Sequence, residues 1–192
     1  MKTGTLLRGA VAVLAITLAT TMASAQALNS GAQTIALNAN LAESLTLTLS
    51  ANAVNFTLSA GSAANAGSTA ITATTAWTLK PGRTTVGVYA YFASAAAALT
   101  DGAGDNIPSS AFFISDNGGA STALTATVPA GGGFGGANAG FQLANVAITG
   151  ANKASSRTDA MAFNINLTGG TLPQLPAATY TGTLNIQAQA TP

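Results

Sequence analysis

The sequence predicts an all-β protein, built as a sandwich or barrel of about ten short strands. Apolar and polar residues alternate with period two in one segment after another. Turn-forming glycine and proline residues separate these segments, and no segment shows a sustained helical period. Such short strands at regular spacing are typical of sandwiches and barrels rather than of mixed folds.

The first residues predict a secretory signal peptide. Lys2 and Arg8 give a positive start, residues 10–18 form a short apolar run, and residues 23–25 read Ala-Ser-Ala, a typical cleavage site. The apolar run is shorter than the roughly 18 to 20 residues that span a bilayer, so no transmembrane segment is expected after cleavage. We therefore expect an exported protein, in the periplasm, at the cell surface or outside the cell. Residues 1–25 would be the signal peptide and residues 26–192 a single domain.

Composition excludes several classes of function. Without Lys2 and Arg8, four basic residues remain against five acidic ones, a net charge of −1. This charge is too low for a protein that neutralises a run of phosphates, so nucleic acid is not an expected partner. The chain has no cysteine and no histidine, which excludes disulfides and metal sites built from thiolate or imidazole.

The first predicted strands surround one well-defined turn. Residues 43–50 alternate cleanly, residues 68–79 are rich in threonine and end near Trp77, and residues 84–92 follow. Between the last two lies Lys-Pro-Gly-Arg, residues 80–83, in which Pro81 fixes φ and Gly82 accepts a positive φ. We interpret this turn as the tip of a β-hairpin.

Further strands are expected along the rest of the chain, each with the same alternation of apolar and polar positions. Their predicted ranges are residues 33–37, 55–58, 111–115, 121–128, 140–149, 160–168 and 179–190. Residues 129–140 contain a high proportion of glycine and are expected to form a flexible loop.

No arrangement of residues predicts catalysis or a cofactor. Gly131 to Gly136 match G-x-G-x-x-G, but no helix follows to point at a pyrophosphate. Asp101 and Asp105 lie in a glycine-rich loop and are interpreted as turn formers that bond their own backbone. A serine nucleophile has no histidine or lysine motif to activate it. Arg157 and Asp159 lie just before a predicted strand, and if they pair, the effect would be to hold the start of that strand.

Three aromatic residues could either fill the core or bind a ligand. Trp77 shares the parity of Ile71 and Leu79, which places it inward, between two sheets. Tyr89 and Tyr91 fall on one face beside a glycine. That face is either a second core or an exposed aromatic ladder that could contact a glycan.

The two ends of the mature chain are candidates for assembly by strand pairing. The last strand has no charge and no proline, although edge strands of soluble monomers are usually guarded by one or the other. Near the start, four apolar residues share one parity and could lie in a groove of the same chain, as its first strand, or of a neighbour. We favour the same chain. The candidate pairing residues are Ile35, Leu37, Ala39 and Leu41 at the start, and Tyr180, Gly182, Leu184 and Ile186 at the end.

The stretches "LPAATYTGTLNIQAQA" and "LAESLTLTLS" carry a resemblance to a known family. They resemble the closing and opening strands of secreted pilin-like domains, the group of spore coat protein U and chaperone-usher fimbrial subunits. The resemblance implies an immunoglobulin-like sandwich, here of about eight to ten strands, and donation of one subunit's strand to the next. The expected function is that of a non-enzymatic structural protein of the cell surface or of a pilus-like assembly, with itself or similar subunits as partners. The alternative is a carbohydrate-binding or adhesive module that contacts polysaccharide through Tyr89, Tyr91 or the loops around Asp101 and Phe134.

Overall fold

The computed structural model describes residues 30–192 of the 192-residue chain. The predicted signal peptide, residues 1–25, and the predicted mature start at Gln26 lie outside the described residues. The chain divides into two units, Met1–Ala39 and Asn40–Pro192, and every strand of the described residues lies in the second. This second unit, residues 40–192, is called the domain below.

The larger of two main sheets in the domain is wholly antiparallel. Strand β3 (Ile71–Thr78) pairs with the edge strand β1 (Ser44–Leu49) on one side and with the long strand β10 (Ala154–Ile165) on the other. Beyond β10 come β7 (Phe112–Asp116) and β8 (Thr122–Ala123), and β2 (Asn65–Ala66) pairs with the far end of β10.

The smaller sheet has three antiparallel strands. Its central strand is β4 (Thr85–Tyr91), between β11 (Asn185–Thr191) and β9 (Gly140–Ala147). A separate short pair is formed by β5 (Leu99–Thr100) and β6 (Asn106–Ile107), and two single 3-10 turns are η1 (Ser109–Ala111) and η2 (Leu172–Gln174). The predicted all-β class is therefore confirmed. None of the helices in residues 30–192 has the length and apolar character needed to cross a membrane.

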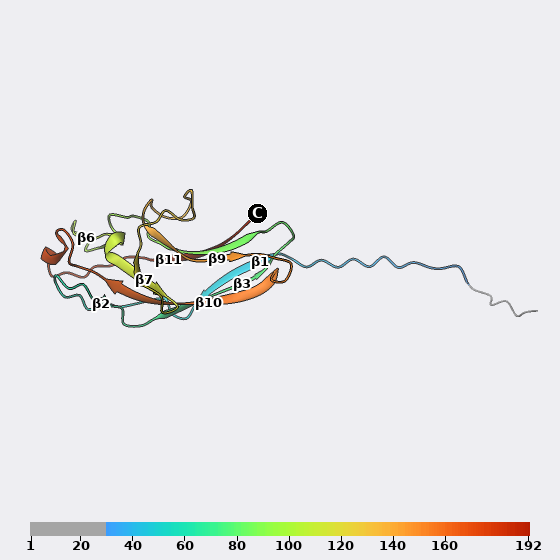
Figure 1. Cartoon of the computed structure of the whole chain (residues 1–192), viewed down its shortest axis with the longest axis horizontal. Helices are drawn as coiled ribbons and strands as arrows, with labels where there is room; N and C mark the ends of the chain where they lie inside the picture. The colour runs from blue at the N-terminus through green and yellow to red at the C-terminus, as the bar shows by residue number, and fades with distance from the viewer. Residues whose placement is uncertain (1–29) are drawn as a thin grey trace, which may run out of the picture. The chain divides into compact units, whose positions relative to one another are not determined.

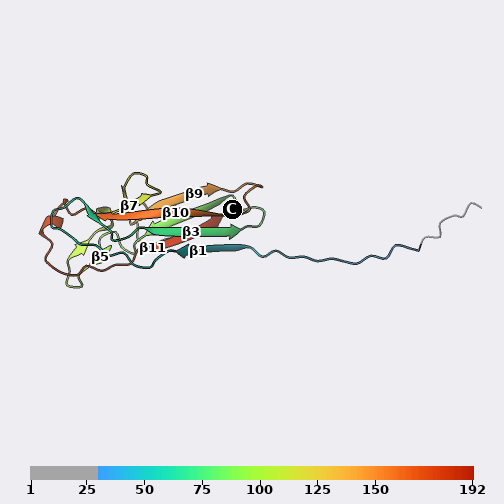
Figure 2. The same ribbon diagram turned by 90° about the horizontal axis from the view of Figure 1, so that it is seen from below.

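The two main sheets face each other in a sandwich-like arrangement (Figures 1 and 2). The alternation in β3 buries Ile71, Ala73, Thr75 and Trp77 on one face, as period-two patterning requires. Side chains of both sheets make up the shared core, among them Ile71, Met161 and Phe163 from the larger and Val88, Ala90 and Leu143 from the smaller. Trp77 points inward as predicted, and its Nε1 donates a hydrogen bond to the carbonyl of Asn152 at 2.9 Å.

The turn at residues 80–83 has the predicted local geometry, but it does not close a hairpin. Gly82 has φ of 99°, and the N–H of Arg83 bonds the carbonyl of Lys80 at 3.5 Å. The strands before and after it, β3 and β4, belong to different sheets. The prediction of a hairpin was wrong because turn chemistry determines only the reversal of the chain, whereas the partners of each strand are set by distant residues.

Several strand boundaries also differ from the prediction. Residues 33–37 belong to no strand, and in residues 55–58 only Phe56 forms a bridge, with Gly67. Strand β10 begins at Ala154 rather than at residue 160, and β11 begins at Asn185 rather than at residue 179. In the first two cases apolar alternation is present but no neighbouring strand supplies a ladder of hydrogen bonds.

A cluster of charged groups lies on the inner face of the larger sheet. Arg157 and Asp159 do pair, with Nε to Oδ2 at 2.9 Å, but inside β10 rather than before it, and Asp159 is fully buried. The amide of Asn117 donates to both Asp159 and Asp116. One carboxylate oxygen of Asp116 has no hydrogen-bond partner among the described residues. Burial, and then the charge of Asp159, raise the pKa of Asp116 above its usual value of 3.8.

The loop at Asp101 has the turn that the sequence predicts. Oxygen Oδ1 of Asp101 accepts hydrogen bonds from the backbone N–H groups of Ala103, Gly104 and Asp105, at 2.8, 3.1 and 3.0 Å. These bonds, that of Ala103 first, lower the pKa of Asp101 below its usual value of 3.8. Asp101 therefore organises this loop through its own backbone.

The two aspartates predict opposite pH dependences of stability. A raised pKa in the folded state means that the charged form of Asp116 costs stability at neutral pH, and this cost disappears as the pH falls through the folded pKa towards 3.8. Asp116→Asn should therefore raise the free energy of unfolding at neutral pH, with a gain that shrinks on acidification. Asp101→Asn should lower the free energy of unfolding at neutral pH, and this loss should also become smaller as the pH falls. Urea denaturation from about pH 7 to pH 4 measures both effects, and changes of the same sign in the two variants would contradict the account.

Candidate functional site

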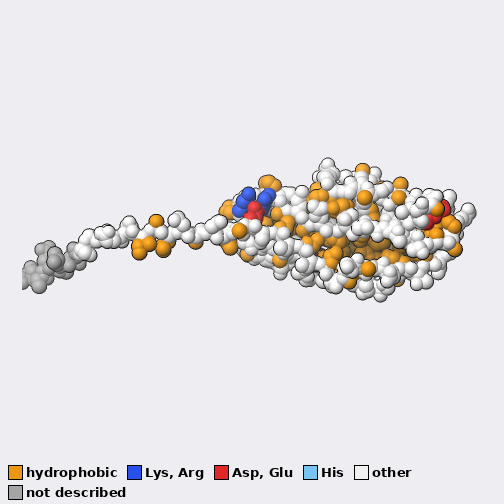
Figure 3. All heavy atoms as spheres, turned by 180° about the vertical axis from the view of Figure 1, so that it is seen from behind, with side chains coloured by type: hydrophobic (Ala, Val, Ile, Leu, Met, Phe, Trp, Pro, Cys, Tyr) orange, Lys and Arg blue, Asp and Glu red, His pale blue; other side chains and the backbone are white. Residues whose placement is uncertain are grey.

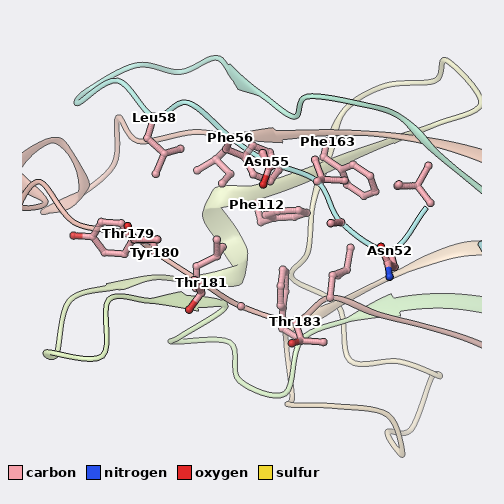
Figure 4. Close-up of a pocket in the computed structure, with 18 of the residues that line it drawn as sticks. Asn52, Asn55, Phe56, Leu58, Phe112, Phe163, Thr179, Tyr180, Thr181 and Thr183 are labelled. Carbon is pink, nitrogen blue, oxygen red and sulfur yellow. The ribbon is translucent and has the colours of Figure 1, made fainter. Parts of the chain in front are cut away.

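An apolar groove of about 760 Å³ lies in the surface of the domain. One wall is residues 49–58, the chain that leaves β1, and the other is residues 177–184, the chain that leads into β11. Figure 4 shows side chains of both walls turned towards the space between them, with Phe56 and Leu58 on one side and Tyr180 and Thr181 on the other. The groove therefore runs between the edges of the two main sheets.

The floor of this groove is the core of the domain. Phe112, Met161, Phe163 and Ile165 are all buried residues of the main core, and all of them line the groove. The ring of Phe112 contacts those of three other phenylalanines, with centroid distances of 5.8 Å to Phe56, 5.1 Å to Phe92 and 5.9 Å to Phe163. Since aromatic clusters of this kind pack with fixed relative orientation, the floor is a preformed apolar surface.

At one end of the groove, side-chain contacts link the two strands that continue into its walls. Strands β1 and β11 lie beside each other without pairing. At this closed end, Arg83 contacts Glu43 through Nε at 2.8 Å and the carbonyl of Ala190 through Nη1 at 3.2 Å. Beyond Leu49 and before Asn185 the two chains leave their strands. At this open end the groove widens to include Leu58 and residues 177–180.

Both walls have free backbone groups. Within the described chain, residues 51–54 and 177–180 make no hydrogen bond from one backbone group to another. Residues 51–53 and 177–179 are exposed, so water can reach these backbone groups in the isolated domain. A further strand laid in the groove would find unpaired donors and acceptors along both walls.

No residue that lines the groove carries a formal charge. Asn52, Asn55 and the threonines of residues 179–183 supply its polar groups, and the phenol of Tyr180 donates to the carbonyl of Pro176 at 3.0 Å. Burial, followed by the charges of Asp101 and Asp105, raises the pKa of Tyr180 above 10.0. Among residues 30–192, no group of three or more acidic, histidine or cysteine side chains is placed to hold a metal ion. This lining is suited to binding an extended apolar segment rather than to acid–base or metal chemistry.

The predicted pairing residues of the last strand all line the groove. Tyr180, Gly182 and Leu184 lie in the wall before β11, and Ile186 lies in β11 itself. Gly182 is required by a close approach of two backbones, because a Cβ atom there would lie 2.0 Å from the carbonyl oxygen of Ala98. Beside it, Thr181 and Thr100 exchange two backbone hydrogen bonds of 2.9 Å.

The predicted pairing residues of the N-terminal segment are exposed. Ile35, Leu37 and Leu41 are 85%, 89% and 83% exposed, and Ala39 is also exposed. None of residues 30–43 belongs to a strand. An exposed row of large apolar residues on one parity costs free energy unless a surface covers it.

The predicted glycan residues form a small packed cluster instead of a free ladder. Tyr89 is 8% exposed and its ring lies across Gly87, where a Cβ atom would meet the phenol oxygen at 2.3 Å. Phe134, from the glycine-rich loop, stacks on Tyr91 with centroids 5.6 Å apart and meets Tyr89 edge-on at 5.7 Å. These contacts occupy ring faces that a sugar would need.

Sequence reasoning missed one wall and the floor of the groove. Val54, Phe56 and Leu58 alternate in the sequence, which predicts part of a strand, whereas in the structure they line the groove. The alternation is therefore a real signal of a buried face, with no ladder beside it. Phe112 and Phe163 reach the floor only because β7 and β10 are neighbours, which no local pattern indicates.

The close approach at Gly182 gives a test of the groove wall. Gly182→Ala should lower the free energy of unfolding by roughly 1–3 kcal/mol, because the new methyl group overlaps the backbone of Ala98. Gly150→Ala is the matched control, since nothing lies within 4 Å of a Cβ atom there, and its effect should stay within about 0.5 kcal/mol. Equal effects of the two substitutions in urea denaturation would show that the wall does not approach residues 98–99 in this way.

Comparison with known proteins adds no relative to this picture. No protein-family model matches the chain, and no curated protein or solved structure matches it significantly. The functional assignment below therefore depends on the groove, on the N-terminal segment and on the chemistry of their residues.

Proposed function

We propose that this protein is an exported, non-enzymatic structural subunit that assembles by strand addition. The N-terminal segment, residues 34–42 of one copy, lies in the groove of the next copy and completes its incomplete immunoglobulin-like sandwich. The assembly is a cell-surface or pilus-like polymer of identical or similar subunits. The observation that carries the proposal is an uncharged groove, open to the core, in a chain that also has an exposed apolar segment of strand periodicity.

The segment and the groove match in chemistry and in length. Ile35, Leu37, Ala39 and Leu41 are two residues apart, so in an extended chain all four side chains point to one face. At about 3.3 Å per residue, residues 35–41 span about 20 Å, comparable to the eight-residue wall 177–184. Strand addition of this kind combines backbone hydrogen bonds with side chains that enter pockets at alternate positions.

Insertion into a neighbouring copy is favoured over insertion into the same copy. The chain enters its own domain at the closed end, where Glu43 contacts Arg83, whereas the groove lies beyond the other end of β1. To reach its own groove, the segment would have to reverse direction between Leu41 and Ser44. Residues 41–43 are Leu-Ala-Glu and contain none of the residues that favour a tight turn.

The same geometry gives the direction of the inserted strand. The domain that donates the segment must stay outside the acceptor, so the segment leaves through the open end, beside Leu58 and residues 177–180. Its N-terminal part then points towards the closed end. Residues 177–184 run from the open end to the closed end, so the donated strand is antiparallel to them. An antiparallel partner is the geometry already used throughout both main sheets.

The free-energy gain is plausible in size. Burial of a large apolar side chain contributes about 1.5–3 kcal/mol, and the segment brings three of them, Ile35, Leu37 and Leu41, from full exposure. Covering the groove removes further apolar surface of the half-buried Val54, Phe56 and Leu58 from water, and the free backbone groups of both walls gain partners. These terms oppose the cost of association and of ordering the segment.

Substitution of the apolar row should abolish assembly without unfolding the domain. In the mature chain, Ile35→Asp, Leu37→Asp and Leu41→Asp together should leave a monomer in size-exclusion chromatography with light scattering, where the unsubstituted chain gives a ladder of species. Because the substituted chain keeps its groove, it should also cap polymers of the unsubstituted chain and shorten them in proportion to the amount added.

The matched control places the same charges on the other parity. Thr34→Asp, Asn38→Asp and Asn40→Asp change the polar face of the segment, which would point away from the floor. This variant should retain polymers, although shorter or slower to form. If both variants fail to assemble, the claim that only the apolar face of the segment enters the groove is contradicted. An unsubstituted chain that stays monomeric at every concentration would overturn the proposed function.

A further inference from the structure

The charges of the domain are gathered at its two ends. Figure 3 shows basic and acidic side chains together at the end where the chain enters the domain, and acidic side chains at the other end. The first group is Glu43, Lys80, Arg83 and Lys153, and the second is Asp101 and Asp105. The remaining charges of residues 40–192 are Asp116, Arg157 and Asp159, in the cluster on the inner face of the larger sheet. We call the two groups the basic pole and the acidic pole.

The basic pole has an excess of two positive charges. Arg83 pairs with Glu43 through Nε at 2.8 Å, and Lys80 lies 3.7 Å from the same carboxylate. This arrangement, with the hydrogen bond from Arg83 as its largest cause, lowers the pKa of Glu43 below 4.5, so Glu43 stays charged at neutral pH. Lys153 donates to the backbone carbonyl of Arg83 at 2.8 Å. The side chain of Lys80 is 64% exposed, so a second charge can approach it.

The acidic pole has two negative charges and borders the open end of the groove. Neither Asp101 nor Asp105 takes part in a salt bridge within the described part of the chain. The backbone bonds between Thr100 and Thr181 fasten the loop that carries them to the groove wall. Their charges are also felt by the phenol of Tyr180, a groove residue, whose pKa they help to raise.

We propose that the acidic pole of one copy docks on the basic pole of the next, so that Asp105 faces Lys80 across the junction between subunits. This inference rests on the proposed function. The inserted segment leaves the acceptor at the open end, beside Asp101 and Asp105, and enters its own domain at Glu43, beside Lys80 and Arg83. Only Ala42 separates the last apolar residue of the segment, Leu41, from Glu43. The strand connection therefore brings an excess of two positive charges next to two negative ones.

The docked poles have a kinetic and a geometric consequence. Opposite charges on two approaching surfaces raise the rate of productive encounter, and salt suppresses this effect. All copies carry both poles, so each junction leaves one basic and one acidic end free. Such head-to-tail contacts generate an open filament rather than a closed pair. The poles thus select the relative orientation in which two subunits meet. The strand inserted in the groove then supplies the lasting contact.

Charge exchange between the poles provides the test. Lys80→Glu and Asp105→Lys each place like charges at the junction, whereas the double variant, with both substitutions, exchanges the two charges and restores attraction. Assembly of the mature chain should be followed by light scattering, at low ionic strength and at about 1 M, where the Debye length is about 3 Å. We expect each single variant to assemble roughly tenfold more slowly than the unsubstituted chain at low salt, and the double variant to recover most of that rate. At high salt all four chains should converge.

Two controls separate docking from other effects. Thr158→Glu changes the net charge on an exposed position of β10, away from both poles, and should leave the rate nearly unchanged. Thermal melting of each variant checks that the domain stays folded. Single variants that assemble as fast as the unsubstituted chain, or a double variant as slow as the singles, would overturn the docking and leave strand addition standing. An unsubstituted chain that does not assemble in any salt overturns both.

Discussion

The guanidinium of Arg83 bridges the chain that enters the first strand of one sheet and the last strand of the other, at the closed end of the groove. It contacts Glu43, immediately before β1, and the carbonyl of Ala190, near the end of β11. No comparable contact is present among the described residues at the other end of the groove, where residues 49–58 and 177–184 form opposite walls. The sheets are therefore fastened on one side of the core and open on the other.

An open core would be a liability in an isolated subunit. Exposed apolar surface joined to unpaired strand edges is the usual starting point of aggregation, and few charges are available in this domain to prevent it. The proposed strand addition would use the same surface in an ordered way, with one segment of defined length and parity in one groove. The small number of charges then has a clear distribution: two poles at the ends, and one cluster around the buried Asp159.

The sequence predicted the parts of the fold that depend on local pattern. The alternation in β1, β3 and β4 was sufficient to place Trp77 in the core and to give the all-β class. It was not sufficient to pair the strands, so the turn at residues 80–83 predicted a hairpin although it passes from one sheet to the other. The burial of Asp159 was missed for the same reason, since it follows from the neighbours of β10 rather than from its own residues. At the site, parity alone identified Leu184, Ile186 and the apolar row of the segment, but it could not show that residues 33–37 have no strand beside them in their own chain.

Hydrogen exchange of backbone amides in the assembled protein tests the central claim most directly. Amides of residues 34–41 and of residues 177–184 should exchange much more slowly in polymers than in the monomeric variant with the apolar row substituted, because each would then belong to a new antiparallel ladder. Amides of β4, which are already paired on both sides, should change little and serve as the internal reference. Polymers in which both residue ranges exchange as fast as in the monomer would show that the subunits are joined through another surface.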